Sequence, residues 1–261
     1  MIEIKHRDTN ATIYRSDTAT TVREAVEEAV NADADLTNAN LADADLSYAY
    51  LGSAILTNAY LGSAILTNAN LGSANLSSAY LGSAYLGSAN LTNANLADAD
   101  LSSANLGSAN LGSANLSSAN LGSAYLVGAN LVGADLSSAN LGSAYLVGAN
   151  LGGANLGGFN APSIPDIDAA ILAAIENGGT LEMGEWHTCE TTHCRAGWAI
   201  HLAGDAGRAL ETRIGPSAAG ALIYAASGSH PVPYWHAANA KAMADLRERA
   251  ARSNAAIEGA Q

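Results

Sequence analysis

The side chains best suited to acid–base, nucleophilic or metal chemistry gather in one short segment, residues 187–201. This segment contains three histidines and two cysteines. Thiolates and imidazoles are the usual protein ligands of zinc, so one interpretation is a structural zinc site. Its candidate ligands are His187, Cys189, His193 and Cys194. Their spacing fits poorly, because four residues separate the two cysteines and His193 directly precedes Cys194.

The same cysteines allow two other interpretations. Cys194, at the start of a predicted helix, could be a nucleophile of lowered pKa, with His187 or His193 as its base. Alternatively, Cys189 and Cys194 are small residues of an apolar core. A disulfide between them would require the intervening loop to bring them together. The spacing favours the core interpretation, so we expect no catalytic residue, no metal and no cofactor.

The elements around this segment predict a small α-helical C-terminal domain, residues 162–261. A first helix is predicted from Asp166 or Asp168 to Asn177, where two glycines end it. The string CRAGWAIHLAG predicts a short buried helix, and two more helices are expected at 218–226 and 236–251. The longer string CETTHCRAGW resembles one in uncharacterised bacterial and phage proteins, a resemblance that implies no activity.

The N-terminal residues 1–31 predict a hairpin followed by a helix. Alternation at Ile2 and Ile4, a turn at DTNA and a return strand favour a β-hairpin over residues 1–17. Thr20 or Thr21 can then cap a helix, with Glu24 placed for a capping box. We expect this unit to cover the open end of the array that follows.

Residues 32–161 form an array with a period of five. Leucine occupies every fifth position from Leu36 to Leu156, 25 times without a gap, and alanine stands two places before each leucine. Five residues rotate an α-helix by about 500°, which would spread the leucines around it. A flat strand would place successive leucines on alternate faces. A coil that turns a corner every five residues instead directs leucine and alanine inward and three residues outward.

The repeated motifs ADL, ANL, AYL and AIL, each followed by two small residues, resemble the A-[D/N]-L-x-x signature of pentapeptide-repeat proteins. This resemblance implies a mainly β fold, a right-handed quadrilateral β-helix in which four repeats close one turn of about 20 residues. The array would then form a solenoid of about six coils between the N-terminal hairpin–helix cap and the helical domain.

With 20 residues per turn, the residue before each leucine stacks into four outward columns. Asparagine predominates in them, and stacked asparagines can hydrogen-bond along a column. Tyrosines and isoleucines interrupt the columns and are the candidate partner-binding residues, because tyrosine is enriched at binding surfaces. We expect Tyr50, Ile55, Tyr60 and Ile65 to form a contiguous exposed apolar patch. The full set of candidate partner-binding residues is Tyr50, Ile55, Tyr60, Ile65, Tyr80, Tyr85, Tyr125 and Tyr145. Alternatively, these rings only stabilise the stacked strands, since ordinary protein surfaces also carry apolar residues.

Charge excludes several function classes. The chain has a net charge of −13, and no Lys or Arg occurs between Glu24 and Cys194. Direct nucleic-acid binding is therefore not expected, because phosphate contacts need clustered cations. No stretch is long and apolar enough to span a membrane, and the charged N-terminus lacks a signal peptide's apolar run, so we expect a cytoplasmic protein.

The array also lacks histidine, cysteine and any basic residue, so we expect a non-catalytic scaffold that binds a protein. The resemblance implies one candidate partner, since some pentapeptide-repeat proteins imitate duplex DNA, bind type II topoisomerases and dimerise through the C-terminal end. A homodimer through residues 162–261 is thus possible. The alternatives are a structural spacer, a phage-associated component whose helical domain binds the partner, and a metal-binding or enzymatic C-terminal domain.

Overall fold

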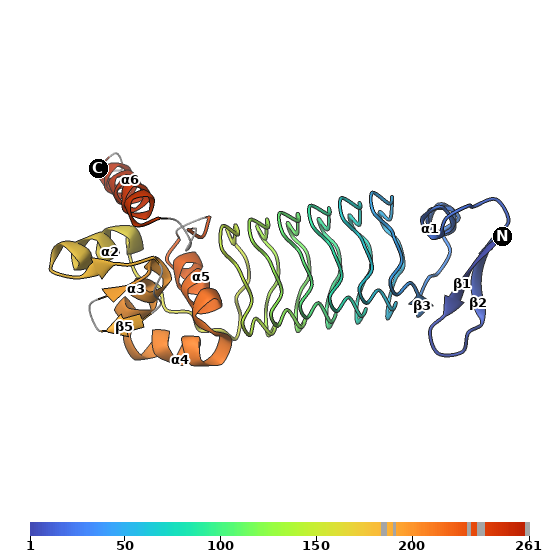
Figure 1. Cartoon of the computed structure of the whole chain (residues 1–261), viewed down its shortest axis with the longest axis horizontal. Coiled ribbons are helices and arrows are strands. Elements are labelled where there is room, and N and C mark those ends of the chain that lie inside the picture. Colours follow the sequence, from blue (N-terminus) through green and yellow to red (C-terminus); the bar gives the residue numbers. More distant parts are fainter. Residues whose placement is uncertain (184–186, 190–191, 229–230, 234–237, 259–261) are drawn as a thin grey trace. The chain divides into compact units, whose positions relative to one another are not determined.

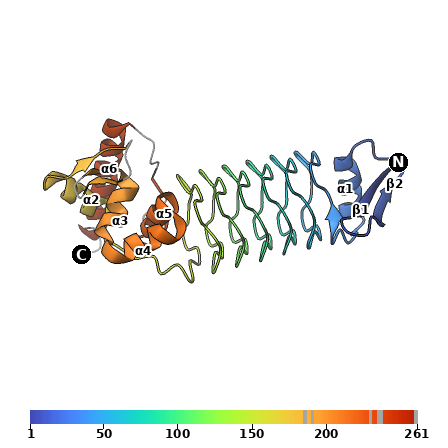
Figure 2. The same ribbon diagram turned by 60° about the horizontal axis from the view of Figure 1, so that its bottom comes forward.

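The computed structural model describes residues 1–183, 187–189, 192–228, 231–233 and 238–258, with backbone only for 187–189, 192 and 253–258. These residues form two compact units. One comprises residues 1–145 and 149–158, and the other comprises residues 146–148 and 159–261. Figure 1 and Figure 2 show the elements of each unit in two orientations.

The first unit begins with the predicted hairpin and helix. Strand β1 (Ile2–His6) pairs antiparallel with β2 (Thr12–Ser16) and, on its other edge, with the short strand β3 (Ala39–Asn40). Helix α1 (Val22–Asn31) has Thr21 as its N-cap and the complete capping box with Glu24. Because β3 belongs to the array, the hairpin extends the hydrogen bonding of the array's first turn.

The array is a coil in which each residue lies beside the residue 20 positions later. Parallel bridges link these pairs from Asp35–Ile55 to Asp135–Asn155. Hydrogen bonds join neighbouring turns; for example, the Leu51 amide donates to the Asn70 carbonyl at 2.7 Å. Between sides, the chain turns a corner through a tight turn whose third residue has positive φ, as at Ser53 (φ 58°). Figure 2 shows these turns in succession.

The core of the array is built from the two inward positions of each repeat. The leucines from Leu36 to Leu151 and nearly all of the preceding alanines are buried. Alanine leaves room for the leucines in the narrow interior, where close packing excludes larger side chains. The predicted separation of inward leucine and alanine from outward polar residues is thus confirmed.

The second unit is mainly helical. Its helices are α2 (Ile167–Glu176), α3 (Arg195–Leu202), α4 (Gly204–Ile214), α5 (Pro216–Ala226) and α6 (Asn239–Glu258). Three short strands, β4 (Thr180–Leu181), β5 (His187–Cys189) and β6 (Thr192–His193), form a sheet in the order β4–β6–β5. None of the helices in the described parts of the chain is both long and apolar enough to cross a bilayer.

Two features of this unit differ from the sequence-based expectations. Helix α4 and the small sheet were not predicted. Two glycines obscure α4, because glycine disfavours helix interiors. The packing explains Gly207, since a Cβ there would lie 2.4 Å from the Ile200 carbonyl oxygen of α3. The last helix begins at Asn239 and reaches Glu258, whereas we expected residues 236–251; residues 236 and 237 lie outside the described part.

Candidate functional site

The four sides of the array differ in the residue that precedes each leucine. The parallel bridges confirm the predicted columns. Two columns are rich in aromatic residues: the Tyr60 column (Asn40, Tyr60, Tyr80, Asp100, Asn120, Asn140) and the Tyr85 column (Asp45, Ile65, Tyr85, Asn105, Tyr125, Tyr145). Two are rich in asparagine: the Asn90 column (Tyr50, Asn70, Asn90, Asn110, Asn130, Asn150) and the Asn95 column (Asp35, Ile55, Asn75, Asn95, Asn115, Asp135, Asn155).

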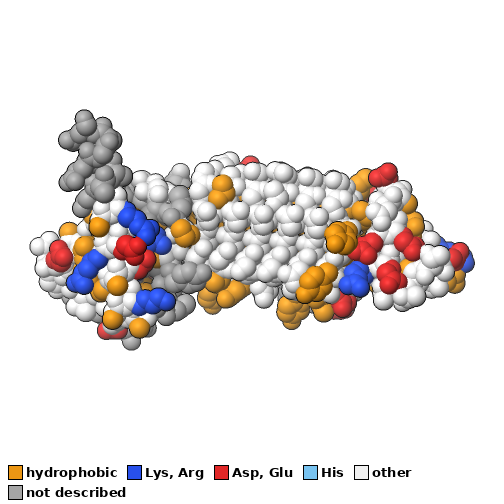
Figure 3. Space-filling view, turned by 90° about the horizontal axis from the view of Figure 1, so that it is seen from above, with side chains coloured by type: hydrophobic (Ala, Val, Ile, Leu, Met, Phe, Trp, Pro, Cys, Tyr) orange, Lys and Arg blue, Asp and Glu red, His pale blue; other side chains and the backbone are white. Residues whose placement is uncertain are grey.

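Residues five apart lie on neighbouring sides, so the columns of each kind adjoin. The Tyr60 and Tyr85 columns form two neighbouring sides, which we call the tyrosine sides. The Asn90 and Asn95 columns form the other two, the asparagine sides. The array thus has an aromatic half and an amide half around one core. On the face shown in Figure 3, it carries mostly uncharged polar side chains and separate groups of hydrophobic ones.

Amide side chains hydrogen-bond along the asparagine sides, as predicted. The Asn90 Nδ2 donates to Asn70 Oδ1 at 3.0 Å, and Asn130 Nδ2 donates to Asn110 Oδ1 at 2.9 Å. Each Oδ1 also accepts from the backbone amide two residues later; for example, Thr92 N donates to Asn90 Oδ1 at 3.1 Å. The amide oxygens of these columns are therefore used within the array.

The tyrosine sides have exposed rings instead. Tyr60 and Tyr80 stack with centroids 4.9 Å apart and planes 18° apart, while Tyr125 and Tyr145 lie 6.4 Å apart and tilted by 41°. The parallel bridges confirm that each pair lies one above the other in its predicted column. Rings in these two columns remain 37% to 53% exposed although they contact one another.

Glycine allows Tyr80 to lie against the backbone. A Cβ at Gly62 would be 2.7 Å from a Tyr80 ring carbon, and a Cβ at Gly82 would be 2.8 Å from the Tyr80 hydroxyl oxygen. Both distances are too short for side chains in contact, so alanine at either position would displace the ring. The two glycines therefore help to set how the Tyr60–Tyr80 stack is presented.

The expected contiguous patch of Tyr50, Ile55, Tyr60 and Ile65 is wrong. These residues are exposed, but the 20-residue bridges place them on four successive sides of the coil. Tyr60 and Ile65 lie on the tyrosine sides, whereas Tyr50 and Ile55 lie on the asparagine sides. Residues adjacent in the repeat sequence therefore encircle the coil, and contiguity along a side comes from residues 20 apart.

Two exposed apolar residues were missed by considering only the position before leucine. Tyr48 is 64% exposed and Val132 is 42% exposed. Both occupy the two-residue segments between repeats, which are also outward positions. The signal was present in the sequence, because nearly every other residue in these segments is small or polar.

The N-terminal residues bring two cations to the array. The Arg7 guanidinium lies over the Tyr60 ring, 5.8 Å from its centroid, and its Nη1 donates to the Asn58 carbonyl oxygen at 3.0 Å. Arg23 Nη1 donates to the Ser47 carbonyl oxygen at 3.0 Å. The tyrosine stack therefore already contacts one guanidinium from this chain.

In the helical unit, the structure brings together part of the segment with the histidines and cysteines. The rings of His193 and His201 lie 4.9 Å apart, and Trp198 meets both edge-on. His187 pairs with His193 in the antiparallel register of β5 and β6. The side chains of His187 and Cys189, two of the metal candidates, lie outside the described residues. Among the described side chains, no group of three His, Cys, Asp or Glu residues is placed to hold a metal ion.

Cys194 does not fit the nucleophile hypothesis. It is a free, buried thiol at the N-cap of α3, and its Sγ accepts from the Gly197 amide at 3.3 Å. Burial raises the pKa of this thiol, although backbone amides oppose the shift. A nucleophilic cysteine needs a lowered pKa, so the structure supports the core interpretation of Cys194.

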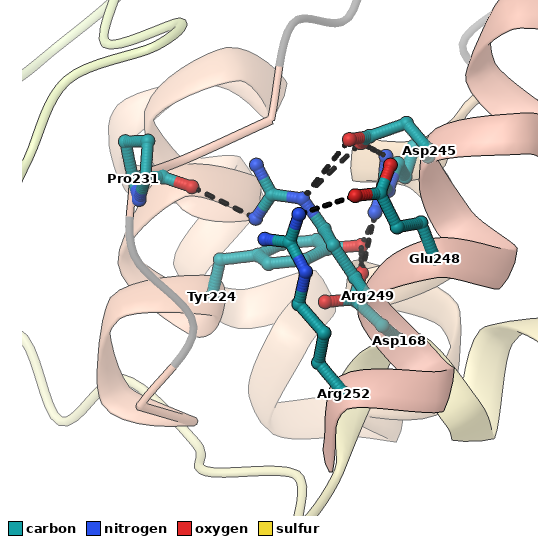
Figure 4. Close-up of polar contacts among 8 residues, drawn as sticks. Asp168, Tyr224, Pro231, Asp245, Glu248, Arg249 and Arg252 are labelled. Atoms are coloured by element: carbon teal, nitrogen blue, oxygen red, sulfur yellow. Dashed lines mark hydrogen bonds and ion pairs between the residues drawn. The ribbon is translucent and has the colours of Figure 1, made fainter. Parts of the chain in front are cut away.

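The densest polar contacts of the helical unit surround Arg195, which the sequence analysis did not single out. Arg195 is buried and donates to Tyr224 Oη at 3.0 Å, to Asp168 at 2.6 Å and to Asp245 at 2.5 Å. Asp168, Tyr224 and Asp245 belong to α2, α5 and α6, and Figure 4 shows them converging. Arg249 extends the contacts from Asp245 to the Pro231 carbonyl oxygen.

The surroundings of Arg195 and Tyr224 determine whether each side chain is charged. Burial opposes charge on Arg195, but Tyr224, Asp168 and Asp245 raise the pKa of the guanidinium. Burial likewise raises the pKa of Tyr224, which keeps its hydroxyl protonated. The guanidinium thus stays charged between two carboxylates, and the cluster joins four helices through buried polar contacts.

Known proteins resemble the array. A family model described as pentapeptide repeats, in 8 copies, matches residues 34–72, 74–112 and 114–153. No curated protein sequence matches the chain significantly. The solved structure of Rfr23, a pentapeptide repeat protein from the cyanobacterium Cyanothece 51142, is 40% identical over 38% of this chain and 57% of its own, with a TM-score of 0.28.

Two further solved structures are similar. HetL, a pentapeptide repeat protein involved in heterocyst differentiation regulation from Nostoc sp. strain PCC 7120, is 30% identical over 48% of this chain and 79% of its own, with a TM-score of 0.26. QnrB1, a plasmid-mediated fluoroquinolone resistance protein, is 23% identical over 44% and 58%, with a TM-score of 0.40. The chain spans less than two thirds of Rfr23 and of QnrB1.

The assignment rests on the repeat model and on the residues that it matches, since the TM-scores are too low to support a superposition. The matched segments follow the leucine and alanine period of the array and do not extend into residues 159–261. Residues 34–153 therefore belong to the pentapeptide-repeat family, whose fold is a right-handed quadrilateral β-helix.

Proposed function

We propose that this chain is a non-catalytic scaffold whose array binds a protein partner through its outward side chains. In this proposal, residues 1–31 protect the N-terminal edge of an array of about six coils, and residues 162–261 form a separate helical domain. The observation that carries the proposal is the pair of neighbouring tyrosine sides. Their rings are exposed on the coil, and the array has no histidine, cysteine, lysine or arginine.

A type II topoisomerase is the partner class that we propose to test first, by imitation of duplex DNA. The absence of Lys and Arg from Glu24 to Cys194 supports this choice. The DNA-binding surface of a topoisomerase is basic, so a protein that occupies it must not carry the same charge. Charge density is the weakest part of the match. The array has seven aspartates over a coil roughly 30 Å tall, whereas duplex DNA has one charge per about 1.7 Å. The exposed tyrosines would then supply binding energy that charge alone does not.

A supercoiling assay with DNA gyrase and the purified full chain tests this function. We expect micromolar protein to change the rate of supercoiling. Replacing the aspartates on and beside the tyrosine sides should weaken the effect (Asp43→Asn, Asp45→Asn, Asp98→Asn and Asp100→Asn together). Asp135→Asn, on an asparagine side, is the matched control. Supercoiling that is unchanged by the wild-type chain would rule out DNA mimicry toward this enzyme.

A further inference from the structure

Carboxylates lie beside the exposed rings of the tyrosine sides. Asp100 follows Tyr80 in the Tyr60 column, and Asp45 precedes Ile65 in the Tyr85 column. Asp43 and Asp98 are exposed in the turns that border the Tyr60 column. Four of the array's seven aspartates therefore adjoin the tyrosine sides. A ligand on the Tyr80 ring would therefore meet negative charge at Asp100.

The chain itself shows which group fits an exposed ring of this column. Arg7 places its guanidinium over Tyr60 and is held there by the Asn58 carbonyl oxygen. Guanidinium groups are planar and weakly hydrated, so they stack on aromatic faces better than ammonium groups do. Tyr80, next in the column, is exposed, and the array supplies no Lys or Arg to contact it.

We infer that the tyrosine sides bind arginine side chains of the partner protein. The guanidinium groups stack on the exposed rings of Tyr80 and Tyr85, and the Asp100 carboxylate lies next to Tyr80 in its column. This inference rests on the proposed function, because it specifies the chemistry of the partner that the array binds. Charge complementarity carries it: an acidic, aromatic surface favours a cationic, planar group and repels phosphate-bearing polymers and anionic membranes.

Binding of short labelled peptides to the full chain tests this inference without any topoisomerase. Fluorescence anisotropy would compare a peptide of alternating arginine and glycine with matched lysine and citrulline peptides, at about 150 mM salt to screen nonspecific attraction. We expect the arginine peptide to bind several-fold more tightly than the lysine peptide, and the uncharged citrulline peptide to bind most weakly. Equal binding of the arginine and lysine peptides would overturn the stacking interaction.

Ring removal localises the site. The double variant Tyr80→Asn/Tyr85→Asn should fold, because asparagine already stands in both columns, at Asn120 and Asn105. We expect it to bind the arginine peptide at least five-fold more weakly. The matched control Tyr50→Asn removes an exposed ring from an asparagine side and should change affinity less than two-fold. Unchanged affinity in the double variant, with an intact thermal transition, would overturn the assignment of the site.

The two proposals can fail independently. If the chain alters gyrase supercoiling and the double variant does so equally, the scaffold function stands and the arginine site is wrong. If the arginine peptide binds as expected but supercoiling is unchanged, the site stands and the partner is another arginine-bearing protein. Analytical sedimentation tests a third outcome. If the wild-type chain is a dimer and the double variant is a monomer with unchanged peptide affinity, these rings serve self-association and the inference is wrong.

Discussion

The tyrosine sides and the asparagine sides of the array share one backbone and one core but use their outward positions differently. On the asparagine sides, several amides hydrogen-bond to a neighbour along the column, and their oxygens accept from the turn of their own repeat. On the tyrosine sides, rings stack but keep much of their surface exposed to water. The inward leucine and alanine are the same on all four sides, so they stabilise the coil whatever the outward residues are. The outward residues of one side can therefore differ from those of another without changing the core.

The largest expected effect tests what the two kinds of side have in common. Leu96→Ala removes a fully buried side chain from the middle of the array and leaves a cavity. We expect a loss of about 2–5 kcal/mol in the free energy of unfolding, measured by urea denaturation. Tyr85→Asn, an outward change in the same part of the array, is the control and should cost much less. A loss below about 1 kcal/mol for Leu96→Ala would contradict a closely packed leucine core.

A smaller effect tests the amide column. Asn95 donates to Asn75 Oδ1 at 3.3 Å and accepts from Asn115 Nδ2 and the Ala97 amide, both at 3.2 Å. Asn95→Ala removes all three bonds from a half-buried position, so we expect a loss of about 1 kcal/mol, again by urea denaturation. The matched change Asn105→Ala, on a tyrosine side, removes one such bond, from the Gly107 amide at 3.0 Å, and should cost less stability. Equal losses would mean that the amide column contributes no special stability.

Two glycine substitutions test how the ring of Tyr80 is positioned. Gly52→Ala places a Cβ 3.7 Å from the Gly72 carbonyl oxygen, an ordinary contact. It should stabilise the protein by about 0.4–1 kcal/mol, because alanine restricts the unfolded chain. Gly82→Ala meets the Tyr80 ring at 2.8–2.9 Å, so displacement of the ring should cancel this gain. Thermal melting measures the difference, and NMR spectra of the tyrosine rings should change for Gly82→Ala only.

The smallest effect is a pH dependence on an asparagine side. Hydrogen bonds from Ser137 and Asn155 lower the pKa of Asp135 in the folded protein. A carboxyl with a depressed folded pKa contributes stability above its unfolded value, near pH 4, and loses it as pH falls through the folded pKa. Asp135→Asn keeps the acceptor oxygen, so the variant should lose less stability than the wild type between pH 5 and pH 2. Parallel unfolding curves over this range would contradict the prediction.

Much of the array was predictable because its structure repeats locally. Leucine at every fifth residue identified the inward positions, and the family's 20-residue turn then identified the residues that stack. The Asn70–Asn90 hydrogen bond followed from these two facts, since both residues have a fixed place relative to a leucine. The expected patch at Tyr50 and Ile55 failed for the same reason: the period assigns them to different sides, and closeness in sequence was mistaken for closeness on a surface.

The helical unit was less predictable because its contacts join residues far apart in the chain. The sequence alone indicated its helices at α2, α3, α5 and α6, since each has an apolar pattern and a recognisable start or end. Only the tertiary structure placed Asp168, Tyr224 and Asp245 around Arg195, and only burial decided that the pKa of Cys194 rises. The physical reason is range: a repeat determines its packing from neighbours at a fixed spacing, whereas a buried charge depends on partners that folding brings together from several helices.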